Sequence, residues 1–127
     1  MTTATDTRES LSAALKTSTA EAHDKAEHSV FMDDLLAGKL RVADFIALQE
    51  QSWLFYSALE DAARAVADHP LASGIVDPAL ERVNALEHDL DHLHGSTEWR
   101  TPVTPLPATA EYIARLNDIE ETKDVAR

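Results

Sequence analysis

Apolar residues recur along this chain at intervals of three and four, which is the spacing of one face of an α-helix. The first such stripe starts near Thr7 or Glu9 and ends at about His28. No segment alternates apolar and polar residues with a period of two, as a half-buried β-strand would, and glycine is scarce. The pattern therefore predicts an all-α protein.

Capping residues predict where the other helices begin and end. Ser29 has the side chain of a helix N-cap, and Gly38 and Gly95 are the glycines expected just beyond helix ends. The longest expected helix has apolar residues on more than one face, so other helices should cover it on several sides. With their caps, the further helices are expected over 29–38, 42–67, 77–95 and from about 108 nearly to the end of the chain.

Length and composition indicate one globular domain. The 127 residues have room for a single domain, which we expect to span 1–127. Hydrophobic residues make up 44% and charged residues 27%, a balance typical of a protein with a folded core. The chain has no cysteine, which excludes disulfides, thiolate metal sites and cysteine nucleophiles. A metal ion would have to bind histidine or carboxylate side chains.

The net charge of the chain excludes two classes of binding partner. Eleven Lys and Arg against 23 Asp and Glu give a net charge of −12, which repels nucleic acid and anionic membranes. Residues 1–9 lack the cationic start and apolar run of a signal peptide. No apolar run approaches the roughly 20 residues that span a bilayer. We therefore expect a cytoplasmic protein that binds neither nucleic acid nor membrane.

Four of the six histidines are interpreted as surface residues. His69 precedes a proline at a helix end and is expected to cap it. Three further histidines, His88, His92 and His94, lie near the end of the expected fourth helix. They are surrounded by acidic residues and lie beside the apolar stripe of that helix. His88 and His92 are four residues apart, a spacing that lets two imidazoles share a zinc or nickel ion. We favour solvated side chains, and the metal site remains the alternative.

His23, on the first helix, shares a helical face with a cation and a carboxylate. Lys16 lies two turns before it and Glu27 one turn after it. The neighbours Thr19 and Ala26 are small, which leaves room for a large flat ligand. A carboxylate that accepts the Nδ1–H of an imidazole leaves Nε2 free for a metal. This combination fits heme (haem), and a hydrogen-bonded core histidine is the alternative interpretation.

The residues around His23 resemble the heme oxygenase family in its bacterial heme-utilisation branch. The similarity is carried by LKTSTAEAHDKAE at 15–27, FMDDLL at 31–36, LQEQSWLFYSALE at 48–60 and STEWR at 96–100. It extends over the chain from about 11 to 119, which is more specific than any single motif. The resemblance implies a heme oxygenase-like helical bundle.

The resemblance also implies roles for individual residues. His23 would be the proximal iron ligand and Glu27 its hydrogen-bonding partner, while Lys16 would contact a heme propionate. Thr19 and Ala26 would lie against the porphyrin, and Tyr56 occupies the family position whose hydroxyl belongs to the distal hydrogen-bond network. In this family heme is both substrate and cofactor. Dioxygen and electrons from a separate reductase or ferredoxin convert it to biliverdin, CO and ferrous iron.

The glycine-rich segment of the family's distal helix has no counterpart in this sequence. The distal helix of the family carries a Gly-Asp-x-Ser-Gly-Gly run, and none of Gly38, Gly74 and Gly95 follows that pattern. We therefore expect the proximal portion of a truncated enzyme, whose unpartnered apolar faces favour a homo-oligomer. The alternative hypotheses are a non-catalytic heme-binding module and a small acidic helical protein that binds metal or acts as an interaction scaffold.

Overall fold

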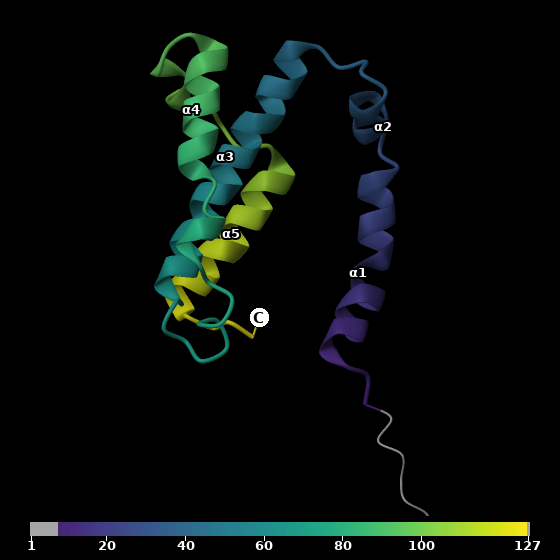
Figure 1. Ribbon diagram of the computed structural model, residues 1–127, viewed down its shortest axis with the longest axis vertical. Helices are drawn as coiled ribbons and strands as arrows, with labels where there is room; N and C mark the ends of the chain where they lie inside the picture. Colours follow the sequence, from purple (N-terminus) through teal and green to yellow (C-terminus); the bar gives the residue numbers. More distant parts are fainter. Residues whose placement is uncertain (1–7, 127) are drawn as a thin grey trace, which may run out of the picture. The chain divides into compact units, whose positions relative to one another are not determined.

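The computed structural model describes residues 8–126, which contain helices and no strands (Figure 1). This confirms the prediction of an all-α protein. The chain divides into two compact units, Met1–Leu40 and Arg41–Arg127. Within the described residues, none of the helices combines the length and the apolar character that crossing a bilayer requires.

The first unit opens with helix α1, Leu11–Glu27, which is capped by Ser10. The Ser10 hydroxyl oxygen accepts a hydrogen bond from the backbone N–H of Ala13 at 3.2 Å, and this satisfies one of the free donors of the first turn. The helix thus begins just after the predicted start at Glu9. The other predicted start, Thr7, lies outside the described residues.

Helix α2, Val30–Leu36, completes the first unit and has the predicted caps. The Ser29 hydroxyl oxygen accepts from the backbone N–H of Met32 at 3.3 Å. Gly38 has a φ of +70°, the left-handed conformation in which glycine ends a helix at no steric cost. No residue of α1 or α2 is buried, and Leu11 is 76% exposed. That exposure is compatible with oligomer formation, which stays a prediction.

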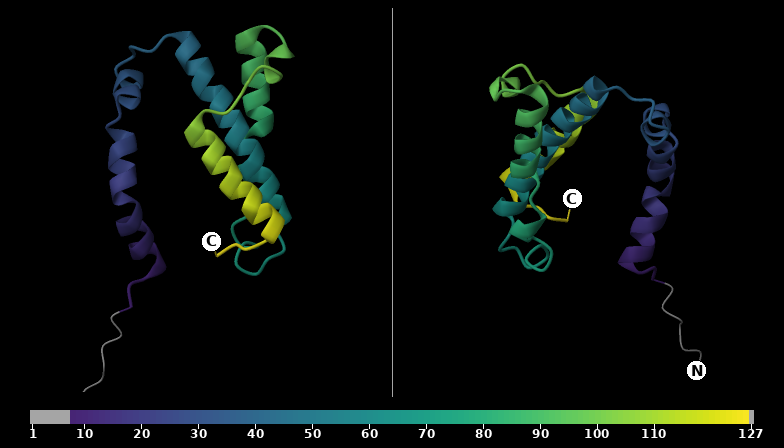
Figure 2. Two further views of the ribbon diagram at one scale, coloured as in Figure 1. Left: turned by 180° about the vertical axis from the view of Figure 1, so that it is seen from behind. Right: turned by 45° about the horizontal axis from the view of Figure 1, so that its top comes forward.

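The second unit is built around α3, Val42–Ala65. Helices α4, Val83–His94, and α5, Pro107–Thr122, both pack against it (Figures 1 and 2). Its core combines Ala58 and Ala62 of α3 with Leu116 of α5, and Leu59 and Ile113 pack around them. Alanine on α3 allows α5 to approach closely, because it has no long side chain to separate the two axes. The prediction that the longest helix is covered on several sides is confirmed only in part, because α4 and α5 pack against α3 while Val42 and Phe45 at its start are exposed.

A side-chain amide fixes the connector that leads into α5. The Nε2 of Gln51, on α3, donates to the carbonyl oxygen of Thr104 at 3.0 Å. The backbone N–H of Leu106 donates to Oε1 of the same amide, also at 3.0 Å. Gln51 therefore satisfies two backbone groups of a proline-rich segment that has no regular hydrogen bonding of its own.

The start of α4 differs from its prediction. Asp77 and Pro78 begin only a short 3-10 turn, η1, over Pro78–Leu80, in which Asp77 accepts the N–H of Ala79 at 2.9 Å. Glu81 then adopts an extended conformation, with ψ at 141°, and breaks the helical hydrogen-bond pattern. Helix α4 begins at Val83, so the predicted start at Pro78 is wrong.

The actual cap of α4 comes from α3. Glu60 is buried, with 5% of its surface exposed, and its Oε1 accepts the backbone N–H groups of Arg82 and of Val83, the latter at 3.2 Å. A carboxylate at a helix N-terminus satisfies free donors and interacts favourably with the helix dipole. Glu60 thereby joins α3 to the start of α4.

Candidate functional site

The face of α1 around His23 has the predicted pairing. Nδ1 of His23 lies 3.4 Å from Oε2 of Glu27, one turn further on, and the two side chains are 75% and 57% exposed. Within the described residues Nε2 of His23 has no hydrogen bond. Within its own unit the imidazole is therefore exposed, and one of its ring nitrogens is open to a ligand.

The remaining predicted residues of this face are also exposed. Lys16 lies two turns before His23 on the same continuous helix. The Thr19 hydroxyl donates to the carbonyl oxygen of Leu15 at 2.7 Å, so its hydrogen is already used within the helix. Ala26 adds only a methyl group to the surface. The structure thus keeps Lys16, Thr19, Ala26 and the His23–Glu27 pair on one helix with no bulky neighbour between them.

A second histidine–carboxylate pair lies on the same helix. Nε2 of His28 is 3.5 Å from Oδ1 of Asp24, with the i, i+4 geometry of the His23–Glu27 pair. Pairing with a carboxylate is therefore common to His23 and to His28, the C-cap residue of α1. The His28–Asp24 pair provides a matched control for any experiment on the first pair.

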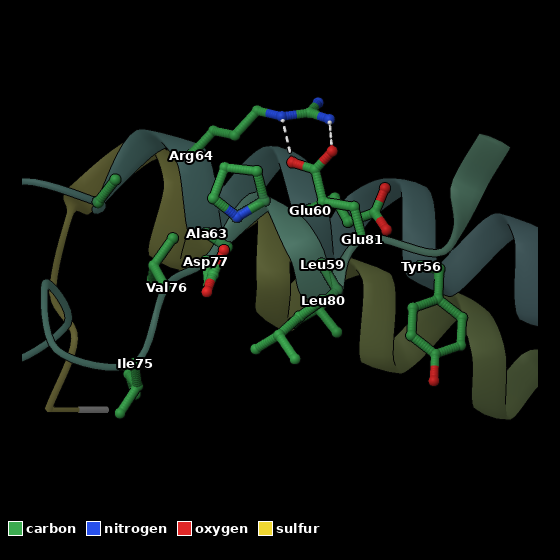
Figure 3. Close-up of a pocket in the computed structure, with 12 residues that line it drawn as sticks. Tyr56, Leu59, Glu60, Ala63, Arg64, Ile75, Val76, Asp77, Leu80 and Glu81 are labelled. Atoms are coloured by element: carbon green, nitrogen blue, oxygen red, sulfur yellow. Dashed lines mark hydrogen bonds and ion pairs between the residues drawn. The ribbon is translucent and has the colours of Figure 1, made fainter. Parts of the chain in front are cut away.

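Tyr56 belongs to the second unit, on α3, where it lies at one end of a cavity of about 380 Å³ (Figure 3). The side chain is half-buried, and its ring centroid lies 4.9 Å from that of Phe55. The opposite end of the cavity is at Ile75, and apolar side chains such as Leu59 and Leu80 line the space between. The Tyr56 hydroxyl is thus a polar group beside a largely apolar hollow.

An ion pair that the sequence did not reveal borders this cavity. Nε and Nη2 of Arg64 donate to the two carboxylate oxygens of Glu81, at 2.9 and 2.8 Å (Figure 3). This two-point contact connects α3 to the segment between η1 and α4. Seventeen residues separate the partners, so no helical spacing could have indicated the pair.

Two tryptophans and three charged residues join α3, α4 and the 3-10 turn η2, Glu98–Arg100. Trp99 is 4% exposed, and its Nε1 donates to Oδ1 of Asp91 at 2.7 Å. Nη1 of Arg100 donates to the same oxygen at 2.9 Å. The Trp53 ring meets that of Trp99 edge to face at 4.9 Å, and its Nε1 donates to Glu87 at 3.1 Å. Every indole N–H in this cluster therefore has a carboxylate acceptor.

The pKa of Asp91 is lowered, chiefly by the hydrogen bond from Trp99 and also by Arg100. A carboxyl group whose pKa is lower in the folded state stabilises the fold above its unfolded pKa, near 4. That contribution is lost as the pH falls through the lowered folded value. We therefore expect Asp91→Asn to unfold with a flatter pH dependence below about pH 4, measured by urea denaturation at a series of pH values. A slope equal to that of the unmodified protein would contradict this assignment.

The histidines of α4 separate into two kinds. His88 and His92 are exposed, as expected. His94 instead places Nε2 2.8 Å from Oε1 of Glu50 on α3, and its ring stacks on Trp99 with 6.0 Å between centroids. In residues 8–126 no group of three or more His, Cys, Asp or Glu side chains is arranged to hold a metal ion. Nδ1 of His69 accepts the backbone N–H of Leu71 at 3.1 Å in the turn beyond α3, so this side chain does not cap the helix end as expected.

Comparison with known proteins gives a consistent family. The family model described as heme oxygenase matches residues 9–126. Heme oxygenase 1 of Gallus gallus is 34% identical over 108 residues, which cover 84% of this chain and 36% of that protein. Heme oxygenase 1 of Nostoc is 30% identical over 109 residues, covering 86% of this chain and 45% of its own length.

A solved structure agrees with these sequence matches. The crystal structure of heme oxygenase-1 from the cyanobacterium Synechocystis in complex with heme superposes with a TM-score of 0.76 and 31% sequence identity. The match covers 86% of this chain and 49% of that one. The chain therefore spans between about a third and a half of the length of the relatives it matches.

Proposed function

This chain belongs to the heme oxygenase family, and we propose on that basis that it binds heme as substrate and cofactor for oxidative cleavage to biliverdin, CO and ferrous iron. The single observation that carries the proposal is the His23–Glu27 pair on an exposed helix face. It combines a histidine with a free ring nitrogen and a carboxylate that orients the ring.

The donor set of α1 fits heme. A neutral imidazole is a common axial ligand of heme iron, and Glu27 next to Nδ1 favours the tautomer in which Nε2 holds a lone pair. The ammonium of Lys16 supplies a positive charge for a propionate. This matters because the chain carries a net charge of −12, which disfavours an anionic ligand. Thr19 and Ala26 leave space for the edge of a porphyrin.

Tyr56 is proposed as the catalytic hydroxyl. A phenolic hydroxyl both donates and accepts hydrogen bonds, so its Oη can hold a proton where a water-linked network needs one. The ring packs against that of Phe55, and Tyr56 lines one end of the apolar cavity. Heme supplies the redox-active iron and the carbon skeleton to be oxidised, and dioxygen and an electron-donating reductase or ferredoxin are the co-reactants.

Two measurements on the full chain test this function. Titration with hemin should give a 1:1 complex with the Soret band of a histidine-ligated heme. The loaded protein, given a reductant, oxygen and catalase, should then form biliverdin. Binding without biliverdin would overturn the catalytic part and leave a heme-binding module. Absence of any heme complex would overturn the whole proposal.

We expect Glu27→Gln to weaken heme binding by about 10- to 100-fold, the range typical of removing a partner that orients a metal-bound histidine. The amide retains an acceptor oxygen and loses the negative charge that strengthens the hydrogen bond from Nδ1–H and so holds the ring in orientation. The measurement is a hemin titration followed at the Soret band.

The matched control for Glu27→Gln is Asp24→Asn. It removes the other histidine-bound carboxylate of α1, which pairs with His28 at 3.5 Å. Heme affinity of this variant should stay at that of the unmodified protein. Equal losses in both variants would show that the effect comes from charge or helix stability and not from the orientation of His23.

A further inference from the structure

Two histidines of α4 open onto one surface hollow. His88 and His92 lie one turn apart, and both line a depression of about 430 Å³ with Phe45, Asp89 and Leu93. Their sharing a hollow shows that the two side chains point to the same side of the helix. The spacing of four residues in the sequence predicts that the two side chains lie on one face of the helix, and their common hollow shows independently that they do.

Both imidazoles are open to a ligand. Each of the two side chains is exposed, and neither makes a hydrogen bond within residues 8–126. The third histidine of the helix differs, because the ring of His94 is held by Glu50 at 2.8 Å and by stacking on Trp99. The helix therefore presents two imidazoles without a hydrogen bond in the described residues, His88 and His92, and one imidazole, His94, that is held by a carboxylate and an aromatic ring.

The chemistry of this pair favours a divalent transition metal ion. Imidazole nitrogen suits zinc, copper and nickel, and side chains four residues apart on a helix are close enough to bind one ion together. The surrounding carboxylates of Glu87, Asp89 and Asp91 and the net charge of −12 raise the local concentration of cations.

We propose that His88 and His92 form a two-histidine site for a divalent ion of the zinc, copper and nickel group. Water molecules complete the coordination, since the described residues offer no third histidine or carboxylate in position. The site lies on α4 and uses none of the residues proposed to bind heme. Because the ion bridges two turns, it binds folded α4 better than the unfolded chain and stabilises the helix.

Equilibrium dialysis and calorimetry with Ni²⁺ on the heme-free full chain test the site. We expect one ion per chain, and a loss of at least about tenfold in affinity for either His88→Gln or His92→Gln, since even removing an outer partner of a metal ligand costs that much. Saturating Ni²⁺ should also raise the melting temperature of the unmodified protein and leave that of the double variant unchanged.

Two control variants separate this site from other histidines. His94→Gln removes the engaged imidazole of the same helix, and His23→Ala removes the proposed heme ligand. Both should bind Ni²⁺ as the unmodified protein does. Unchanged Ni²⁺ affinity in the His88→Gln/His92→Gln double variant, or an equal loss in His94→Gln, would overturn the proposal. The outcome is independent of heme, so failure here leaves the proposed function untouched.

Discussion

Replacing His23 by alanine is expected to abolish the spectrum of histidine-ligated heme. The structure leaves Nε2 of this imidazole free while Glu27 lies 3.4 Å from Nδ1, so the substitution removes the only ligand atom proposed to bind the iron. Heme that still associates through apolar contact would have a shifted and weakened Soret band. Absorption spectra of hemin complexes, recorded in the ferric and ferrous states, measure this directly.

The specificity of this effect can be checked on the same helix. His28→Ala removes a histidine with a similar carboxylate pairing and should leave the spectrum unchanged. Added imidazole should restore a nitrogen-ligated spectrum to His23→Ala, because the free ligand can occupy the vacated position. If His23→Ala keeps the original spectrum, another residue binds the iron and the proposed site is wrong.

Replacing Glu60 by alanine is expected to lower the free energy of unfolding by about 3 kcal/mol. The buried carboxylate accepts two backbone N–H groups at the start of α4, and a hydrogen bond to a charged group contributes about 1.5–3 kcal/mol. Alanine leaves both donors without a partner and opens space beside α3. Urea unfolding followed by tryptophan fluorescence is a suitable measurement, since Trp53 and Trp99 both lie in this unit.

Glu81→Ala is the matched control for Glu60. Glu81 is also a glutamate near the start of α4, but its side chain is 31% exposed and it pairs with the exposed Arg64. Ion pairs of this kind contribute roughly 0–1 kcal/mol. The loss of unfolding free energy in Glu60→Gln should lie between those of the two alanine variants, because the amide oxygen can still accept a hydrogen bond from a backbone N–H. Equal destabilisation by Glu60→Ala and Glu81→Ala would refute the capping role of Glu60.

Local signals in the sequence were sufficient for most of the helix boundaries. Ser29, Gly38 and Gly95 act through backbone groups within a few residues of themselves, so their spacing along the chain carries the information. Asp77 and Pro78 are also a typical helix start, an N-cap residue followed by proline. In the structure they begin only a 3-10 turn. The start of α4 depends on Glu60, which is distant in sequence and looks like an ordinary polar position of a helix.

In the candidate site too, contacts within one helix could be predicted from the sequence and contacts between separate elements could not. The contact between His23 and Glu27 follows from helical spacing, and the structure confirms it. The two-point contact between Arg64 and Glu81, and the stacking of His94 on Trp99, depend on how separate elements pack together. Periodicity carries no information about which elements meet, so these contacts could be found only from the fold.

Helix α1 has no buried residue within its own unit, and this has a thermodynamic consequence for the proposed heme binding. A helix with no buried residue gains little stability from packing, so few contacts offset the conformational entropy lost on ordering it. In the proposed complex, the porphyrin adds apolar contacts that α1 does not make within its own unit. Part of the binding free energy is then spent on ordering the helix, so the measured affinity reports the helical propensity of 11–27 as well as the strength of the iron–nitrogen bond.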